Sequence, residues 1–135
     1  MTVRVRFAPA PTGDLHVGGA MVAVANDLLR RRDGGTFVLR LDDTDAAGAV
    51  PGAEAAIADA LDWLGIAVDE GPLRQSARGD AHCALAEELV AAGAAERLAD
   101  GAVVLPALER DSVVDDLSRG PIRLPAGAIG RTVLV

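Results

Sequence analysis

The sequence predicts an α/β fold in which a parallel sheet is flanked by helices, followed by a short β-rich C-terminal segment. Short apolar runs alternate with longer helical patterns over the first two thirds of the chain. The run at residues 37–41 is almost continuously apolar, as in strands buried on both faces. Glycines follow three of the helical patterns, at residues 34–35, 65 and 93, where helices commonly end. Alternating strands and helices favour a parallel, Rossmann-like sheet.

The first two thirds divide into these elements by apolar periodicity and by helix start and stop signals. We expect strands at residues 3–7 and 37–41, with a possible short strand at 66–68. We expect helices at residues 18–32, 51–64 and 80–92. Pro51 lies in the first turn of its helix, where the missing N–H costs little.

The last third has a different pattern, with short β-rich runs separated by Pro and Gly turns. We expect strands at residues 102–105, 121–124 and 131–135, and either a short helix or a loop at 108–117. At 135 residues the chain is expected to form one domain (1–135), with a nucleotide-binding half at 1–93 and a connecting remnant at 94–135.

Composition narrows the classes of function. The net charge of −7 argues against strong autonomous tRNA binding, because phosphate contacts require a basic surface. The single cysteine, Cys83, excludes an internal disulfide and a cysteine cluster for zinc, and its Ala- and Leu-rich surroundings predict that it is buried. No apolar run has the length of a signal peptide core or a membrane span, so a cytoplasmic location without membrane contact is expected.

The turn between the first strand and the first helix carries the chemistry. Residues 7–19 (FAPAPTGDLHVGG) contain two prolines that stiffen the turn and glycines that let a ligand approach the backbone. The free N–H groups of a helix N-terminus bind anions, and His16 can add a hydrogen bond or a charge there. The pattern is neither a Walker motif nor Gly-x-Gly-x-x-Gly, yet it suits a nucleotide triphosphate.

These residues resemble the opening of glutamyl-tRNA synthetase, a class I aminoacyl-tRNA synthetase whose ATP-binding motif is known as HIGH. The resemblance rests on RVRFAPAPTG (4–13) and LHVG (15–18), and on four later segments in the family's order. Those segments are GGTFVLRLDDTD (34–45), LDWLGI with DEGP (61–72), QSAR (75–78) and LAEELV (85–90). The resemblance is strong over residues 3–93 and weak beyond.

The resemblance implies ATP, with or without Mg²⁺ and without zinc, as the cofactor, and a reaction that joins an amino-acid carboxylate to the nucleotide. It implies His16 as the catalytic residue. The nucleotide-binding residues that it implies are Pro11, Thr12, Gly13, His16, Gly18 and Gly19. The amino-acid-binding residues that it implies are Arg6, Ala8, Ala10 and Asp42.

Several of these residues have an alternative structural interpretation. Arg6 could equally be part of a surface ion pair. The acidic residues Asp42, Asp43 and Asp45 could bind magnesium, although a capped loop is the better interpretation and no metal site is expected. The run of Arg30, Arg31 and Arg32 fits a solvated helix C-terminus better than an RNA contact.

The chain also departs from the family. Ala10 replaces a serine and Asp42 replaces a glutamate, and no KMSKS-like loop is present because all thirteen basic residues are arginines. These departures leave three hypotheses. The first is a truncated synthetase-like protein that binds ATP or an adenylate and is completed by a second copy or a partner chain. The second is a catalytically inactive paralogue acting as a dimeric interaction module, and the third is a sensor of a carboxylate or nucleotide.

Overall fold

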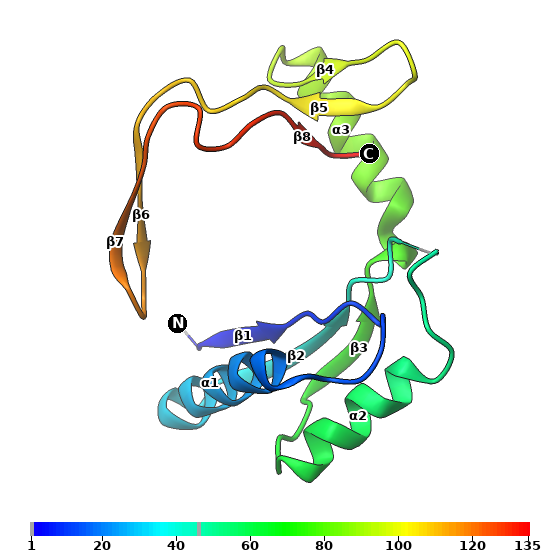
Figure 1. The fold of residues 1–135 in the computed structure, drawn as a ribbon, viewed down its shortest axis with the longest axis vertical. Helices are drawn as coiled ribbons and strands as arrows, with labels where there is room; N and C mark the ends of the chain where they lie inside the picture. The colour runs from blue at the N-terminus through cyan, green and yellow to red at the C-terminus, as the bar shows by residue number, and fades with distance from the viewer. Residues whose placement is uncertain (1, 46) are drawn as a thin grey trace. The chain divides into compact units, whose positions relative to one another are not determined.

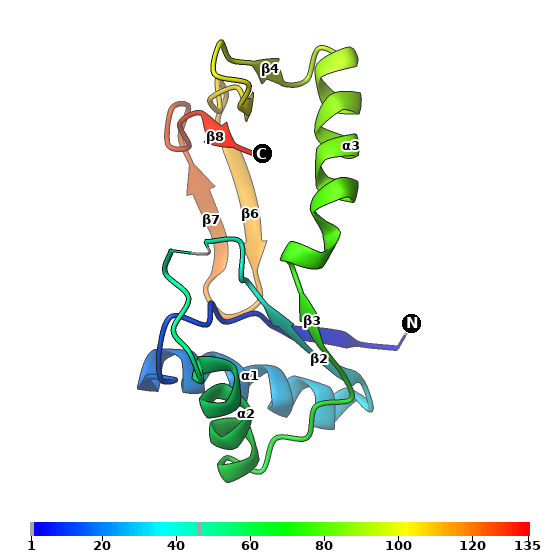
Figure 2. The same ribbon diagram turned by 90° about the vertical axis from the view of Figure 1, so that its right-hand side faces the viewer.

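The computed structural model describes residues 2–45 and 47–135, which form two compact units that are divided in the sequence between Arg78 and Gly79. Figures 1 and 2 show the elements, and each unit is described by itself. Whether the two units form one domain, as the sequence predicts, stays a prediction. No helix within the described ranges is long and apolar enough to cross a membrane.

The first unit is a three-stranded parallel sheet with two helices on one face, which confirms the predicted α/β class (Figures 1 and 2). The strands are β1 (Arg4–Phe7), β2 (Thr36–Leu41) and β3 (Glu70–Arg74), in the order β1-β2-β3. The helices are α1 (Val17–Asp33) and α2 (Ala53–Trp63), and a 3-10 turn, η1 (Ser76–Arg78), follows β3. This order brings the carboxyl ends of β1 and β2 together at one edge of the sheet, where ligands bind in such folds.

Buried and exposed residues alternate along β1, and the buried ones form the core of this unit with residues of β2 and the helices. Val5 and Phe7 of β1 lie opposite Phe37 and Leu39 of β2, and all four are buried. Ile57 and Leu61 of α2, together with Ala23 of α1, complete the same cluster. Arg4, Arg6 and Arg40 occupy the alternate positions, so the strand face away from the helices is basic.

Glycines end the helices where the sequence predicts. Gly34 follows α1 with φ +63°, and Gly65 follows α2 with φ +69°. The backbone N–H of Gly35 donates to the carbonyl of Arg30, and that of Ile66 donates to the carbonyl of Leu61. These bonds satisfy carbonyls that would otherwise lack partners at the helix ends.

The strand predicted at residues 66–68 is wrong. Ile66 is buried against the core and closes α2, so pairing with β2 begins later, where Val38 lies opposite Glu70. Asp69 fixes this position, because its carboxylate accepts a hydrogen bond of 2.7 Å from the backbone N–H of Phe37.

The second unit combines one helix with short antiparallel strands. The helix α3 (Gly79–Ala91) packs on a three-stranded sheet of β4 (Glu96–Arg97), β5 (Val103–Leu105) and β8 (Thr132–Val133). A separate hairpin consists of β6 (Ser112–Asp116) and β7 (Gly120–Leu124). These strands confirm the predicted β-rich C-terminal segment.

Two predictions in this unit are wrong. The helix or loop expected at 108–117 contains β6, because Val113 and Val114 pair with β7 and Asp116 caps the turn between the two strands. Cys83 is exposed rather than buried, because the core contacts of α3 begin a turn later, at Ala86.

Candidate functional site

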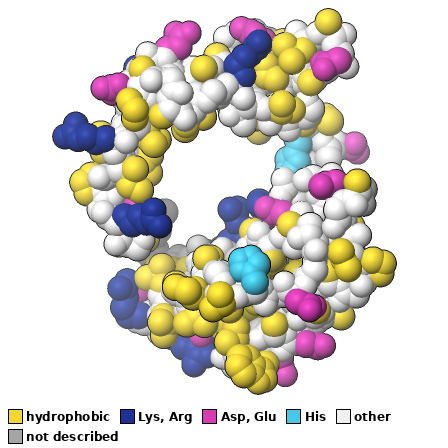
Figure 3. Space-filling view, in the orientation of Figure 1, with side chains coloured by type: hydrophobic (Ala, Val, Ile, Leu, Met, Phe, Trp, Pro, Cys, Tyr) yellow, Lys and Arg dark blue, Asp and Glu magenta, His cyan; other side chains and the backbone are white. Residues whose placement is uncertain are grey.

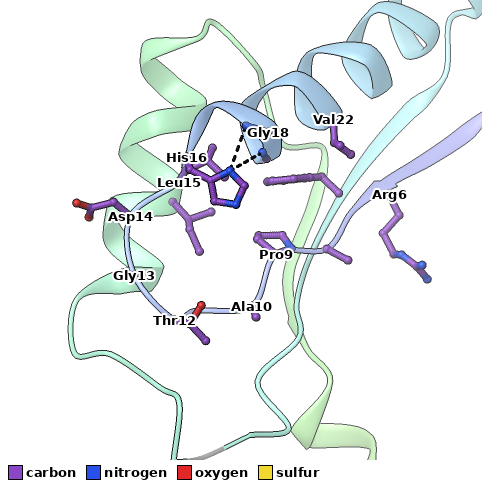
Figure 4. Close-up of a pocket in the computed structure, with 14 residues that line it drawn as sticks. Arg6, Pro9, Ala10, Thr12, Gly13, Asp14, Leu15, His16, Gly18 and Val22 are labelled. Atoms are coloured by element: carbon purple, nitrogen blue, oxygen red, sulfur yellow. Dashed lines mark hydrogen bonds between the residues drawn. The ribbon is translucent and has the colours of Figure 1, made fainter. Parts of the chain in front are cut away.

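A cleft of about 820 Å³ lies at the carboxyl end of β1. It extends from the last residues of β1, through the turn, to the first turn of α1 (Figure 4). Its lining consists of Arg6, Phe7, Ala8, Pro9, Ala10, Thr12, Gly13, Asp14, Leu15, His16, Gly18, Gly19, Val22 and Ile57. The cleft therefore lies where a parallel sheet presents backbone groups to ligands.

His16 is the N-cap of α1. Its backbone is extended, with φ −84° and ψ 169°, and its Nδ1 accepts hydrogen bonds from the N–H groups of Gly18 at 3.1 Å and Gly19 at 3.4 Å (Figure 4). Because Nδ1 accepts, the ring proton is on Nε2, which remains free to donate. Thus the imidazole occupies the two N–H groups that the sequence assigns to phosphate binding.

The imidazole of His16 lies close to Gly18, and the side chain of Leu15 lies close to Gly19. A Cβ on Gly18 would lie 3.0 Å from the Cε1 of His16, and a Cβ on Gly19 would lie 2.6 Å from the Cδ1 of Leu15. The first turn of α1 carries no acidic residue, so its positive dipole end is not neutralised within the helix.

Backbone hydrogen bonds hold the turn before α1 in place. The N–H of Asp42 donates to the carbonyl of Pro9, and the N–H of Val50 donates to the carbonyl of Pro11, both at 3.0 Å. Gly13 has φ +145°, a conformation that residues with side chains rarely adopt. Pro11 is buried and is not among the lining residues. Its carbonyl accepts the hydrogen bond from Val50, so Pro11 holds the turn in position.

Arg6 lines the cleft at its β1 end, and Figure 4 shows its side chain directed away from the imidazole of His16. Within the described ranges it takes part in no ion pair or side-chain hydrogen bond, unlike Arg4, which pairs with Glu70, and Arg40, which pairs with Asp42. Because an arginine fork fits a carboxylate or a phosphate, this guanidinium is available to an anionic ligand.

Asp42 is not among the lining residues, and its carboxylate is occupied. Arg40 donates to its two oxygens at 2.6 and 2.9 Å. This carboxylate raises the pKa of Arg40 above its ordinary value, chiefly through the hydrogen bonds. A ligand ammonium group would have to compete with Arg40 for Asp42.

The remaining acidic residues of this run cap the backbone. Asp43 accepts from the backbone N–H of Ser76 at 2.8 Å and from its hydroxyl at 2.6 Å, and these bonds lower the pKa of Asp43 below 3.8. Asp45 accepts from the N–H groups of Ala47 and Gly48. In the part of the chain that the structure describes, no group of three or more His, Cys, Asp or Glu side chains is placed to hold a metal ion.

The structure thus brings together most of the predicted site and adds residues that the sequence did not single out. Pro11 and Asp42 lie outside the cleft, whereas the other eight predicted residues line it. Ile57 is the clearest omission: it reaches the cleft from α2, and no local signal distinguishes it from other core positions.

Comparisons with known proteins agree with this fold. The family described as tRNA synthetases class I (E and Q), catalytic domain, matches residues 2–100. Glutamate–tRNA ligase 1 of Acidiphilium cryptum is 53% identical over 97 residues, which cover 72% of this chain and 21% of the ligase. Glutamate–tRNA ligase of Porphyromonas gingivalis is 40% identical over 146 residues, covering 97% of this chain and 29% of the ligase.

A solved structure shows the same arrangement of elements. The glutamate tRNA ligase from Elizabethkingia meningosepticum, in complex with its amino acid, superposes with a TM-score of 0.87 at 26% identity. The match covers all of this chain and 38% of the ligase. The chain therefore spans between a fifth and two fifths of the length of the relatives that it matches.

Proposed function

The chain belongs to the catalytic-domain family of class I tRNA synthetases for glutamate and glutamine, and we propose from this premise that its cleft binds ATP and activates an amino-acid carboxylate. The observation that carries the proposal is a cleft lined by both the N-terminus of α1 and Arg6, an arginine that has no ion pair among the residues the structure describes. The N-terminal end of a helix favours phosphates, and the arginine favours a carboxylate.

The proposed roles follow from position. The Nε2–H of His16 donates to a phosphate oxygen, while Gly13, Gly18 and Gly19 present backbone N–H groups to the triphosphate. Thr12 contributes its hydroxyl, because its backbone N–H donates to the carbonyl of Ala10 at 2.9 Å. Pro11 supports them by holding the turn. When the triphosphate displaces the imidazole from the helix end, the N–H groups of Gly18 and Gly19 become phosphate donors.

The amino acid occupies the β1 side of the cleft. Arg6 holds a carboxylate of the substrate, Ala8 and Ala10 leave room beside it, and Asp42 meets the ammonium group once Arg40 shifts. A carboxylate oxygen then attacks the α-phosphorus of ATP, the bond to the bridging oxygen breaks, and pyrophosphate leaves with that electron pair. Positioning and charge stabilisation supply the rate of such a step.

Magnesium would enter with the nucleotide phosphates, since divalent ions are commonly held by a few carboxylates together with substrate phosphates. We propose activation of the carboxylate, rather than complete charging of tRNA, as the reaction of this cleft, because the net charge of −7 is unfavourable for contacts with tRNA phosphates.

A second candidate function is that of an inactive, dimeric interaction module or ligand sensor. The observation that favours it is the exposed apolar surface of α1, where Val17, Met21 and Leu28 are each more than half exposed. An apolar surface of this kind marks an interaction site in many soluble proteins.

Two substitutions at His16 test the proposed function. His16→Asn keeps a side chain that can cap the helix but removes the Nε2–H donor. His16→Ala removes both the capping acceptor and the Nε2–H donor. We expect ATP affinity, measured by calorimetric titration, to fall at least tenfold in both variants. We expect a loss of about 1 kcal/mol in the free energy of unfolding for the alanine variant alone.

Pyrophosphate exchange with glutamate and with other amino acids then identifies the substrate. A folded wild-type protein that releases no heat with ATP, or an asparagine variant that binds ATP as the wild type does, contradicts the nucleotide-binding role of His16. Binding of ATP without pyrophosphate exchange favours the sensor.

A further inference from the structure

The charged groups on the amino-acid side of the cleft are not equally available to a ligand. Arg6 lines the cleft and takes part in no ion pair among the described residues. Asp42 lies next to the cleft, because its backbone N–H donates to the carbonyl of Pro9, a lining residue, at 3.0 Å. Its carboxylate, however, accepts from Nε and Nη2 of Arg40 at 2.6 and 2.9 Å. A ligand carboxylate therefore finds a free partner here, whereas a ligand ammonium group finds an occupied one.

The ion pair between Arg40 and Asp42 is stronger than a typical surface pair. Two parallel hydrogen bonds join the guanidinium to the carboxylate, the strongest arrangement of these two groups. The two side chains are 29% and 33% exposed, so water screens them less than the pair of Arg4 with Glu70, which is 60% and 43% exposed. The partners are two positions apart in the sequence, so little chain entropy is lost when they pair.

No neighbouring carboxylate among the described residues replaces Asp42. Asp43 accepts from the backbone and hydroxyl of a serine after β3, and Asp45 accepts from two backbone N–H groups of its own loop. Asp14 lines the cleft, but at the start of α1, and Figure 4 shows it at the other end of the cleft from Arg6. An ammonium group bound beside Arg6 therefore depends on Asp42 alone.

Charges on this surface act as individual pairs. Figure 3 shows arginine and acidic side chains interspersed over the face that it draws, rather than gathered in a large patch of one sign. The availability of each charged group to a ligand is therefore decided by its own nearest partner.

An ammonium group gains little from this site because it must first displace Arg40. Selectivity between two ligands is the difference between their binding free energies. The contact of an ammonium group with Asp42 is of the same kind as the contact that it replaces, so the gain and the cost nearly cancel. A carboxylate meets Arg6 without displacing any partner that the structure describes.

We propose that Arg40 sets the selectivity of this side of the cleft: by holding Asp42, it makes the site bind carboxylic acids with and without an amino group almost equally well. Arg40 acts through Asp42 and is therefore a positioning residue. The inference rests on the proposed function for the place of the amino acid. It goes beyond that function in naming the ligand class, which includes carboxylates that lack an ammonium group.

The experiment compares L-glutamate with glutarate, which is the same dicarboxylate without the ammonium group. Each is titrated calorimetrically into the whole chain in the presence of a saturating non-hydrolysable ATP analogue. We expect the wild type to bind the two ligands within about threefold of each other. This ratio of affinities tests the inference without any substitution.

Two substitutions at Arg40 then release Asp42 to different degrees. Arg40→Gln removes the charge, and we expect the preference for glutamate over glutarate to rise about three- to tenfold, through tighter binding of glutamate alone. Arg40→Lys keeps the charge but loses the two-pronged contact, so its preference should lie between those of Arg40→Gln and the wild type. A purely structural role of Arg40 would change the affinities of both ligands alike and leave their ratio unchanged.

Two further variants serve as controls. Arg4→Gln breaks the ion pair of another arginine on the same face of the sheet, and it should leave the ratio as in the wild type. In an Asp42→Asn background, Arg40→Gln should no longer change the ratio, because the carboxylate that it releases is gone. Circular dichroism establishes that each variant is folded.

The outcomes separate this inference from the proposed function. A wild type that binds glutamate at least tenfold more tightly than glutarate overturns the inference and leaves the proposed function standing. So does an unchanged ratio in a folded Arg40→Gln or Arg40→Lys variant. A wild type and an Arg40→Gln variant that are folded and bind neither ligand overturn the proposed amino-acid site, and the inference with it. Glutamate binding that appears only in Arg40→Gln supports the inference.

Discussion

Charged side chains around the cleft differ mainly in whether they already have partners. Asp42 is held by Arg40 and Asp43 by Ser76, whereas Arg6 makes no ion pair among the described residues. A residue that already has a partner must exchange it before it can bind a ligand, and this costs part of the binding energy. Arg6 therefore offers the least costly contact to an anion.

The bonds between Asp43 and Ser76 predict a dependence of stability on pH. These bonds lower the pKa of Asp43 in the folded protein below its ordinary value of 3.8. Their contribution to stability is therefore complete at pH values above 3.8, and it is lost as the pH falls through the pKa of Asp43 in the folded protein. Asp43→Asn should therefore destabilise the protein at about pH 6, and the difference from wild type should shrink below about pH 4.

Urea unfolding of both proteins across this range checks the prediction. Other carboxylates titrate alike in the two proteins, so their effects cancel in the difference. A gap between the two midpoints that stays constant from pH 6 down to about pH 3 would contradict the assignment of this carboxylate.

At the scale of elements, α2 both covers the sheet and contributes to the cleft. Ile57 and Leu61 are almost fully buried against β2, and Ile57 also lines the cleft. β3 forms the edge of the sheet that lies opposite β1, and it is exposed along its whole length. The stability of the first unit therefore depends more on the contact of the helices with the sheet than on its outermost strand.

Replacement of leucine by alanine at two positions tests this difference. Leu61→Ala leaves a cavity in the core and should cost about 2–5 kcal/mol. Leu73→Ala, the same change at a half-exposed residue of β3, should cost less than about 1 kcal/mol. Urea unfolding followed by circular dichroism gives both values, and equal losses would show that the core does not centre on α2.

At the scale of the whole molecule, the described residues form two hydrophobic clusters that share no residue. The first cluster draws on residues between Val3 and Ile66, and the second on residues between Ala86 and Leu134. The second has three buried members, fewer than the first. A small unit with so small a core is marginal by itself.

We therefore expect residues 1–78 to fold as an independent unit and residues 79–135 to unfold at lower denaturant concentration. Separate expression of the two segments, with amide hydrogen exchange in each, tests this. Strong protection of the β2 amides in the isolated first unit is the expected result. Its loss would mean that the first unit requires the rest of the chain.

Local patterns in the sequence determined the order of the first elements, the glycine helix ends and the turn that forms the cleft. Such features depend on hydrogen bonds and periodicity within a few residues, which the sequence displays directly. The strand at Glu70–Arg74 could not be located in this way, because its position depends on the pairing of Asp69 with Phe37 across the sheet. Its residues carry no strand pattern of their own.

The tertiary structure alone decided which predicted site residues have partners and which are available. The sequence placed Arg6 and Asp42 together in one binding site, but the register of the strands leaves Arg6 in the cleft, while Arg40 engages Asp42. The same holds for α1, since the sequence shows one amphipathic helix and the packing shows that its apolar residues Val17, Met21 and Leu28 are exposed. Contacts between residues far apart in sequence depend on the whole fold, and no local pattern encodes them.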